Sequence, residues 1–439
     1  MTRKRPARPL HLSRRTLLRG SALAAATGVT GACSAIPIPL VDDPDVLRVG
    51  LVGCGGRGTG AALQAMLAEE GTVQLVAIAD AFPERIEPCL EALRAELGPE
   101  RAERLRVMPE TTFTGLDGYR QVIEAVDVVI LATPPHFRPL HLAAVAAAGK
   151  HCFCEKPVAV DAPGVRSVLA SARVMRDKGL ALASGFCWRA NAGNRELYER
   201  VLAGQIGDVQ AVYSTYLTGP IGPKARRDAE SDLEYQVRNW YPFLWMSGDH
   251  IVEQAVHSID KQQWVFGDAV PLSAVGVGGR IARGDGPDEG NIWDHFSITW
   301  EYGDGRRAFH MCRQIPGCAG DNTDHVYGTK GRAIVEGWTP NYELTGENPW
   351  YYEGEGNDMY QAEHDELFAA IRVGTPLNHG EWMAHSTLVA IQGRMAAYSG
   401  RVITWQMALE SQERLGPASY EPQELAVRPP AVPGRTPFV

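Results

Sequence analysis

The amino-acid sequence predicts an α/β fold in which a doubly wound parallel sheet is followed by an α+β domain with a mostly antiparallel open sheet. Between residues 47 and 154, short runs rich in Val, Ile and Leu alternate with helical stretches, which is the pattern of βαβ units. After residue 160 the strands alternate apolar and polar residues, as antiparallel strands with one solvated face do. The 439 residues suffice for two domains, and 45% hydrophobic and 22% charged residues are ordinary for a globular protein.

The first half of this pattern consists of four apolar strands and the helices between them. Parallel strands are buried on both faces and therefore read as continuous apolar runs. In such sheets, ligands bind at the carboxyl ends of the strands. We expect strands at 47–52, 73–79, 126–132 and 151–154, and helices at 58–70, 83–97, 118–125 and 139–148.

The second half begins with a long helix and continues with strands. We expect the helix at 163–178, strands at 209–217, 273–281, 296–302, 308–313 and 333–336, and a last helix at 384–399 that packs back on the sheet. These elements predict a first domain at 46–160, a second at 161–405 and a C-terminal tail at 406–439.

The N-terminus is strongly basic and precedes a short apolar run. Seven Lys and Arg residues lie within residues 1–19, and the thirteen residues 20–32 are uncharged. The basic part contains Ser13-Arg14-Arg15-Thr16-Leu17-Leu18-Arg19, which resembles a twin-arginine export signal with Leu17 where Phe is usual. Thirteen residues are too few for a helix across a bilayer core of about 30 Å. We therefore expect a signal at 1–33, a Pro-containing linker at 34–45, and a periplasmic or otherwise exported protein that uses the twin-arginine translocase.

Cysteine usage bears on the same segment. The stretch Thr30-Gly31-Ala32-Cys33 resembles a lipobox, although Thr30 stands where Leu is preferred. Lipidation at Cys33 and simple cleavage nearby are both open, and a lipid there is the only membrane attachment that we expect. The eight cysteines are too few and too scattered for a disulfide scaffold, so the others are predicted to be buried thiols.

The formal net charge of −9 is the sum of a basic N-terminal segment and an acidic remainder of the chain. Seven of the 43 basic residues lie in residues 1–19, so the remaining chain has 36 basic against 52 acidic residues, a net charge of −16. A nucleic-acid-binding protein needs a basic face to displace phosphate counterions. The mature chain is therefore not expected to bind nucleic acid.

A glycine-rich turn follows the first predicted strand and opens a helix. Its sequence is Gly53-Cys54-Gly55-Gly56-Arg57-Gly58, which has the spacing GxGxxG. Glycines permit the tight turn, close approach of the backbone to a diphosphate and close helix–strand packing, and the helix N-terminus attracts phosphate. Asp80 ends the next strand, 22 residues after Gly58, where a carboxylate can bind both ribose hydroxyls and repel a ribose phosphate. These features predict a Rossmann domain that binds NAD in preference to NADP, with Arg85 as a nearby cation that complicates this preference.

Further motifs resemble the glucose–fructose oxidoreductase/inositol dehydrogenase (Gfo/Idh/MocA) family over residues 46–405. They are Gly53–Gly58, Thr133-Pro134-Pro135, Gly149-Lys150-His151, Glu155-Lys156-Pro157, and the run from Gly248 to Asp260. The resemblance implies a Rossmann domain, a second domain whose sheet supplies the substrate pocket and often an oligomer face, and a sugar, polyol or related substrate. We therefore expect a homo-oligomeric oxidoreductase that acts on CH–OH groups, with Thr133, Pro134, Glu155 and Lys156 among its cofactor contacts.

The resemblance also implies roles for individual residues. Lys156 falls on the family's catalytic lysine, whose ammonium stabilises a developing alkoxide. His257 falls on the catalytic histidine, a suitable base. Glu253 stands where the family usually has Asp, four residues before this histidine, and it either orients His257 or binds substrate. Arg138 replaces a family histidine, so that contact is altered.

Substrate contacts are predicted around the segment 250–260. At about 100° per residue, His250, Glu253, His257 and Asp260 would share an arc of about 80° on one helix, which favours a helix that lines a cleft. A solvated face and a zinc site are the alternatives, and we expect no metal because hydride chemistry needs His257 free. Trp240, Trp245 and Arg189 are further candidate sugar contacts, with core packing or surface exposure as their alternative.

Export constrains the use of the cofactor, because an enzyme that releases NADH needs a cytoplasmic pool to reoxidise it. The sequence therefore favours a tightly bound cofactor that is recycled within each catalytic cycle. Two chemistries satisfy this requirement. One is oxidation of one sugar coupled to reduction of another; the alternative is a redox-neutral NAD-dependent glycoside hydrolase. A non-catalytic sugar-binding protein is the third possibility.

Overall fold

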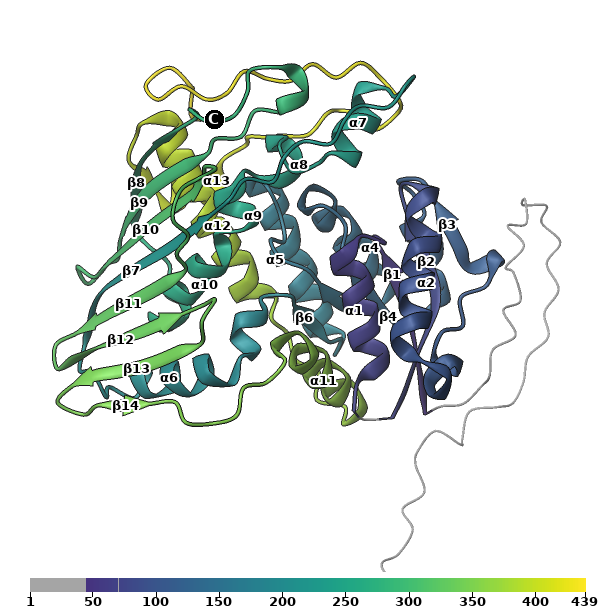
Figure 1. Cartoon of the computed structure of the whole chain (residues 1–439), viewed down its shortest axis with the longest axis horizontal. Coiled ribbons are helices and arrows are strands. Elements are labelled where there is room, and N and C mark those ends of the chain that lie inside the picture. Colours follow the sequence, from purple (N-terminus) through teal and green to yellow (C-terminus); the bar gives the residue numbers. More distant parts are fainter. Residues whose placement is uncertain (1–44, 70) are drawn as a thin grey trace, which may run out of the picture. The chain divides into compact units, whose positions relative to one another are not determined.

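A six-stranded parallel sheet forms the first half of the structure, a computed structural model that describes residues 45–69 and 71–439 (Figure 1). Its strand order is β3-β2-β1-β4-β5-β6, and every neighbouring pair is parallel. The strands are β1 (Val46–Val52), β2 (Thr72–Asp80), β3 (Thr112–Thr114), β4 (Val128–Leu131), β5 (His151–Cys154) and β6 (Leu182–Ser184). The predicted signal at 1–33, Cys33 and all but the last residue of the linker lie outside the described residues.

Helices cover both faces of this sheet, as the βαβ pattern predicts. Leu51 and other β1 side chains pack with α1 (Gly56–Leu67), α2 (Ile86–Leu97) and the late helix α11 (Met359–Arg372). On the other face, α3 (Tyr119–Ala125), α4 (Arg138–Ala148) and α5 (Ala162–Asp177) contribute buried apolar residues. The sheet includes β6, which lies beyond residue 160.

The second sheet has nine strands in the order β14-β13-β12-β11-β7-β10-β9-β8-β15. All its pairs are antiparallel except β7 with β10, which are parallel. The predicted fold class is therefore confirmed. The strands are β7 (Val209–Thr218), β8 (Ser273–Gly279), β9 (His295–Glu301), β10 (Arg307–Gln314), β11 (Thr323–Gly328), β12 (Gly331–Glu336), β13 (Asn341–Gly346), β14 (Trp350–Tyr351) and β15 (Ile403–Thr404).

One face of the second sheet is covered by helices and the other is open (Figure 1). The long helix α12 (Gly380–Ser399) is buried along almost its whole length and packs against β8, β9 and α5, so it joins the two sheets. The helix α6 (Ala192–Leu202) packs on β12 and β13. Within the described part of the chain, no helix is long and apolar enough to cross a membrane.

The single helix predicted across residues 250–260 is wrong, because the chain forms two helices there. They are α9 (His250–Glu253) and α10 (Val256–Val265). At the junction, the Ala255 N–H donates to the His250 carbonyl five residues back, and the His257 N–H donates to the Gln254 carbonyl three residues back. This change in the hydrogen-bond ladder interrupts the regular 100° spacing on which the predicted common face of all four residues depended.

Residues 219–249 connect β7 to α9 and contain α7 (Asp232–Arg238) and α8 (Leu244–Ser247). The C-terminal tail runs along this connection (Figure 1). The Leu233 N–H donates to the Gln423 carbonyl, and the Gln236 side chain donates to the Leu425 carbonyl at 2.6 Å. The tail, which begins with α13 (Trp405–Glu410), therefore holds α7 in place through these hydrogen bonds.

Candidate active site

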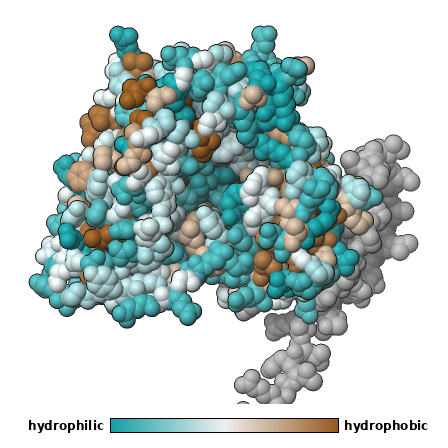
Figure 2. Space-filling model, in the orientation of Figure 1, coloured by the Kyte–Doolittle hydropathy of each residue, from teal (hydrophilic) through white to brown (hydrophobic). Residues whose placement is uncertain are grey.

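The carboxyl ends of β1, β2, β4 and β5 open into one cavity of about 470 Å³. The glycine-rich turn, the end of β2 and the segment after β5 line one part of it, and α7, α9 and α10 supply residues from the second half of the chain. Figure 2 shows a hollow in this face of the molecule, bordered mainly by hydrophilic residues. The cavity is therefore built where the two sheets meet.

The glycine-rich turn has the geometry of a phosphate cradle. Gly53 has φ +103°, which favours glycine, and a Cβ on Gly58 would lie 1.8 Å from the Gly53 carbonyl oxygen. A Cβ on Gly56 would meet nothing within 4 Å. Gly55 caps α1 without a side-chain hydrogen bond, so the first N–H groups of the helix are left to a ligand. These residues fit the diphosphate of a dinucleotide.

Asp80 lines the cavity at the end of β2 and is 8% exposed. One carboxylate oxygen accepts the Cys54 N–H at 2.8 Å, and the other accepts the Phe82 N–H at 2.9 Å. Each oxygen retains a second lone pair that can accept a ribose hydroxyl. Asp80 therefore both fixes the glycine-rich turn and presents negative charge to a ribose.

Lys156 extends from the segment after β5 toward α9. Its Nζ donates to the Glu253 carbonyl oxygen at 2.6 Å and to the Glu253 carboxylate at 3.2 Å. The two side chains are 14% and 13% exposed, so solvent screens this ion pair only partly. Glu253 therefore holds the ammonium of Lys156 at the cavity wall.

His257 lies on α10 in the same cavity. Burial lowers the pKa of the imidazole well below its usual value, and the cations Lys156 and Lys261 lower it further. Within residues 45–69 and 71–439, the buried Nδ1 has no hydrogen-bond partner. The structure therefore presents a neutral imidazole beside Lys156, which is the form that accepts a proton.

Arg57 and Glu155, which also line the cavity, form an ion pair. The Arg57 Nε lies 2.8 Å from a Glu155 carboxylate oxygen, and the other oxygen accepts the Lys156 N–H at 3.1 Å. The Arg57 guanidinium also lies over the ring of Tyr360, 4.8 Å from its centroid. Glu155, which is 3% exposed, therefore positions the backbone of Lys156.

Thr133 and Pro134 follow β4 and line the cavity, as does Trp240. The Thr133 hydroxyl lies 3.3 Å from Nδ1 of His141. Arg138 also lines the cavity, but its guanidinium is directed to the Pro157 carbonyl oxygen at 2.5 Å. Arg138 thus supports the segment that carries Lys156.

Four predicted substrate contacts lie outside the cavity lining. The indole of Trp245 donates to Gln236 at 2.7 Å within an apolar cluster. Arg189 and Asp260 form an ion pair at 2.9 Å in which Asp260 is 1% exposed. His250 is 1% exposed, and its ring packs edge-on against another aromatic ring. The break between α9 and α10 places His250 and Asp260 on different helices. Trp245 and Arg189 are held by their internal partners.

Two family models match consecutive parts of the chain. Residues 47–183 match the oxidoreductase family with an NAD-binding Rossmann fold, and residues 194–334 match the GFO/IDH/MocA C-terminal domain. The chain belongs to the GFO/IDH/MocA oxidoreductase family. It is therefore an oxidoreductase with an NAD-binding Rossmann domain, as the glycine-rich turn and the Lys156 motif predicted.

Two known proteins are similar to this chain. Inositol 2-dehydrogenase of Rhizobium meliloti (strain 1021) is 24% identical over 326 residues, which cover 74% of this chain and 86% of the relative. The 2,7-anhydro-N-acetylneuraminate hydratase of Escherichia coli (strain K12) is 24% identical over 183 residues, which cover 42% of this chain and 44% of the relative.

Solved structures share the fold. Aldose-aldose oxidoreductase from Caulobacter crescentus, complexed with glycerol, aligns with a TM-score of 0.65 at 19% identity, over 82% of this chain and 99% of the other. Levoglucosan dehydrogenase, in a complex with NADH and levoglucosan, aligns with a TM-score of 0.64 at 18% identity over the same shares.

Several residues that line the cavity of this GFO/IDH/MocA oxidoreductase had no signal in the sequence. Lys224 lies in a long connection, and Tyr360 lies on α11, near the end of the chain. Neither residue belongs to a local motif, because tertiary packing alone brings these segments to the glycine-rich turn. Phe137 and His141 follow the Thr133-Pro134-Pro135 motif, so the motif's own helix could have indicated them.

Proposed function

We propose that this protein is an exported oxidoreductase that moves a hydride between NAD and a CH–OH group of a sugar, polyol or sugar derivative. We further propose that its cofactor is tightly bound and recycled within each cycle. The observation that carries the proposal is a single cavity that contains both the phosphate cradle and the group of Lys156, Glu253 and His257.

The chemistry follows from the positions of these residues in the cavity and from the neutral imidazole of His257. A dinucleotide held by the glycine-rich turn and Asp80 would supply the hydride acceptor and donor for the substrate carbon. Lys156 donates a hydrogen bond to the reacting oxygen and stabilises the negative charge that develops on it. The neutral His257 takes the hydroxyl proton as the carbonyl forms, and Glu253 keeps the Lys156 ammonium in place.

Asp80 supports NAD over NADP. Its carboxylate lines the cavity at the end of β2, the position at which a Rossmann domain meets the adenosine ribose. A phosphate on that ribose would be repelled by this charge. The nearby Arg85 would attract such a phosphate and so oppose the effect of Asp80. The ratio of the affinities for NAD⁺ and NADP⁺ measures the resulting preference.

Export and cofactor recycling are supported by the N-terminal sequence. The twin-arginine pattern precedes an apolar run, and a protein outside the cytoplasm lacks a route to reoxidise free NADH. The name of the aldose-aldose oxidoreductase describes transfer between two sugars, which regenerates the cofactor. Either a free mature chain or a lipid anchor at Cys33 is compatible with this pathway.

A redox-neutral glycoside hydrolase is the second candidate function. It is favoured by the similarity to a hydratase of an anhydro sugar, since hydration leaves the oxidation level of the substrate unchanged. In this reaction, transient oxidation would precede elimination and the addition of water, and the same Lys156 and His257 would act on the oxidised carbon.

We also propose that the open face of the second sheet binds a second copy of the chain. Apolar side chains stand on this face, with Val277 68% exposed and Val275 45% exposed on β8. Phe309 and Met311 on β10 face the same way. Hydrophobic residues gather over β8 to β10 in Figure 2, which supports an apolar contact surface.

Product analysis of the mature protein tests the proposed function. Incubated with pairs of aldoses or polyols and without added NAD, it should yield one oxidised and one reduced sugar in equal amounts. Lys156→Met should lower this turnover by about 10²–10⁴-fold, whereas Lys330→Met, at an exposed position outside the cavity, should not. Turnover that requires added NAD would contradict recycling. In a parallel incubation with aryl glycosides, aglycone release without net oxidation would establish the hydrolase instead.

A further inference from the structure

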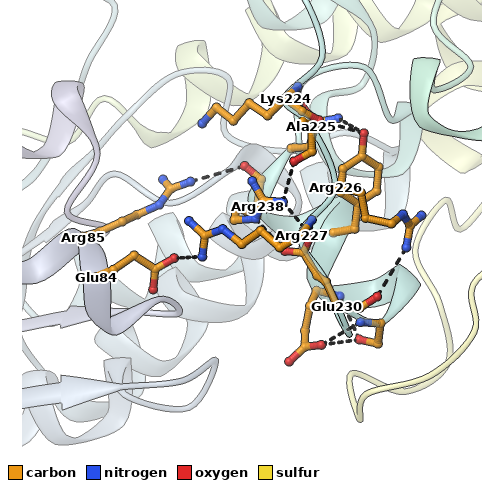
Figure 3. A network of polar contacts seen from close by, with 12 residues as sticks. Glu84, Arg85, Lys224, Ala225, Arg226, Arg227, Glu230 and Arg238 are labelled. Atoms are coloured by element: carbon orange, nitrogen blue, oxygen red, sulfur yellow. Dashed lines mark hydrogen bonds and ion pairs between the residues drawn. The ribbon is translucent and has the colours of Figure 1, made fainter.

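A segment of the second half of the chain is fastened to the Rossmann half beside the cavity. Residues 219–231, which we call the strap, lead from β7 to α7. Arg227 of the strap forms an ion pair with Glu84, which lies just after β2. The next residue, Arg85, donates to the Arg238 carbonyl oxygen at 3.3 Å. Figure 3 shows these contacts between the two halves.

The strap region is rich in cations, and most of them are neutralised. Arg226 pairs with Asp232 at 2.8 Å and with Asp288, Arg238 pairs with Glu230 at 2.5 Å, and Arg227 pairs with Glu84. Among the described residues, Arg85 and Lys224 have no carboxylate oxygen within 4.0 Å. These same two cations line the cavity.

The two unpaired cations, Arg85 and Lys224, lie near the N-terminus of α1. Arg85 Nη1 lies 3.9 Å from the Cβ position of Gly55, the residue that caps α1. In Figure 3 the Lys224 side chain extends toward Arg85, whose side chain comes from the opposite side, whereas Arg226 extends away from both. Both cations therefore stand near the helix N-terminus that attracts phosphate.

Mutual repulsion accompanies this arrangement. Loss of solvent lowers the pKa of Lys224, and the charges of Arg85, Arg238 and Arg227 lower it further. An anion between Lys224 and Arg85 would offset this repulsion, and both residue types form strong charge-assisted hydrogen bonds to phosphate oxygens.

We propose that Arg85 and Lys224 bind the diphosphate of the dinucleotide from the side opposite the glycine-rich turn, so that the strap holds the cofactor onto the Rossmann domain. This inference rests on the proposed function and supplies a physical cause for tight cofactor binding. The diphosphate is favoured over a ribose phosphate, because Arg85 stands over Gly55 and Asp80 lies at the ribose position.

Binding of ligands that differ in their phosphates tests the proposal. We would measure the Kd of the mature chain for NAD⁺, ADP and adenosine by calorimetry, and the dissociation rate of NADH by fluorescence. Lys224→Met and Arg85→Met should each weaken NAD⁺ and ADP binding about tenfold and leave adenosine binding unchanged. Lys224→Arg should restore most of the loss, and the effect should shrink as salt is raised.

Matched controls separate diphosphate binding by Arg85 and Lys224, which we call the clamp, from general effects on charge or folding. Lys330→Met and Arg94→Met remove cations from exposed positions outside the cavity and should leave all three affinities unchanged. Equal losses for ADP and adenosine, or no loss at all, would overturn the proposal. If the clamp variants behave as expected while no sugar is oxidised, the proposed function fails and the clamp stands.

Discussion

At the scale of single residues, Glu363 is a buried acid whose neutral form is favoured near Arg57 and Glu155. Glu363 is 5% exposed, and within the described chain neither carboxylate oxygen has a hydrogen-bond partner. Burial raises the pKa of this carboxyl well above its usual value, Glu155 raises it further, and Arg57 lowers it. The neutral form of Glu363 is therefore favoured, and Arg57 forms its ion pair with Glu155 instead.

The raised pKa of Glu363 has a consequence for stability. The folded state holds the Glu363 proton more tightly than the unfolded state does. Protonated Glu363 therefore contributes fully to the free energy of unfolding below the unfolded pKa of about 4.3. As pH rises toward the folded pKa, this contribution is lost at up to about 1.4 kcal/mol per pH unit. Glu363→Gln removes this loss, so its free energy of unfolding should exceed that of the wild type increasingly from pH 5 to pH 8. Urea titrations would measure it, with Glu366→Gln on the same helix as control. A difference that is constant with pH would contradict a neutral Glu363.

At the scale of elements, the glycine-rich turn and α1 were predictable because their geometry is local. Gly53 and Gly58 have to approach each other for the strand to turn directly into the helix. The break between α9 and α10 was not predictable, since it depends on distant partners. Asp249 accepts the Trp293 N–H at 2.8 Å, and the Gln254 side chain accepts a hydrogen bond from Gln314 at 2.6 Å.

Two glycines of the same turn offer a matched comparison. In Gly58→Ala, the added Cβ meets a backbone oxygen that cannot rotate away, so unfolding free energy should fall by about 1–3 kcal/mol and NAD⁺ binding should be lost. Gly56→Ala points into open space and should change stability by less than about 1 kcal/mol. Thermal unfolding with and without NAD⁺ would compare the two. Equal destabilisation by both substitutions would show that the close approach of Gly58 to Gly53 is not what limits the turn.

At the scale of the whole molecule, the site exists because the two sheets are packed together. Lys156 follows the parallel sheet, whereas Glu253 and His257 come from segments next to the antiparallel sheet, and α12 joins both. The motifs identified these three residues from the sequence. Lys224 and Tyr360 could not be identified in this way, because their places are set only by the path of the strap and by the packing of α11 on α1.

The export proposed above and a cavity lined by both halves of the chain lead to one central proposal: the dinucleotide stays bound while hydride is taken up and returned. The most direct test is the absorbance and fluorescence of the mature protein after gel filtration. We expect bound dinucleotide, a rise at 340 nm of about one equivalent per chain on addition of an oxidisable sugar, and a fall when an acceptor sugar follows. A protein free of dinucleotide that forms NADH only from added NAD⁺, and releases it on each turnover, would contradict the claim.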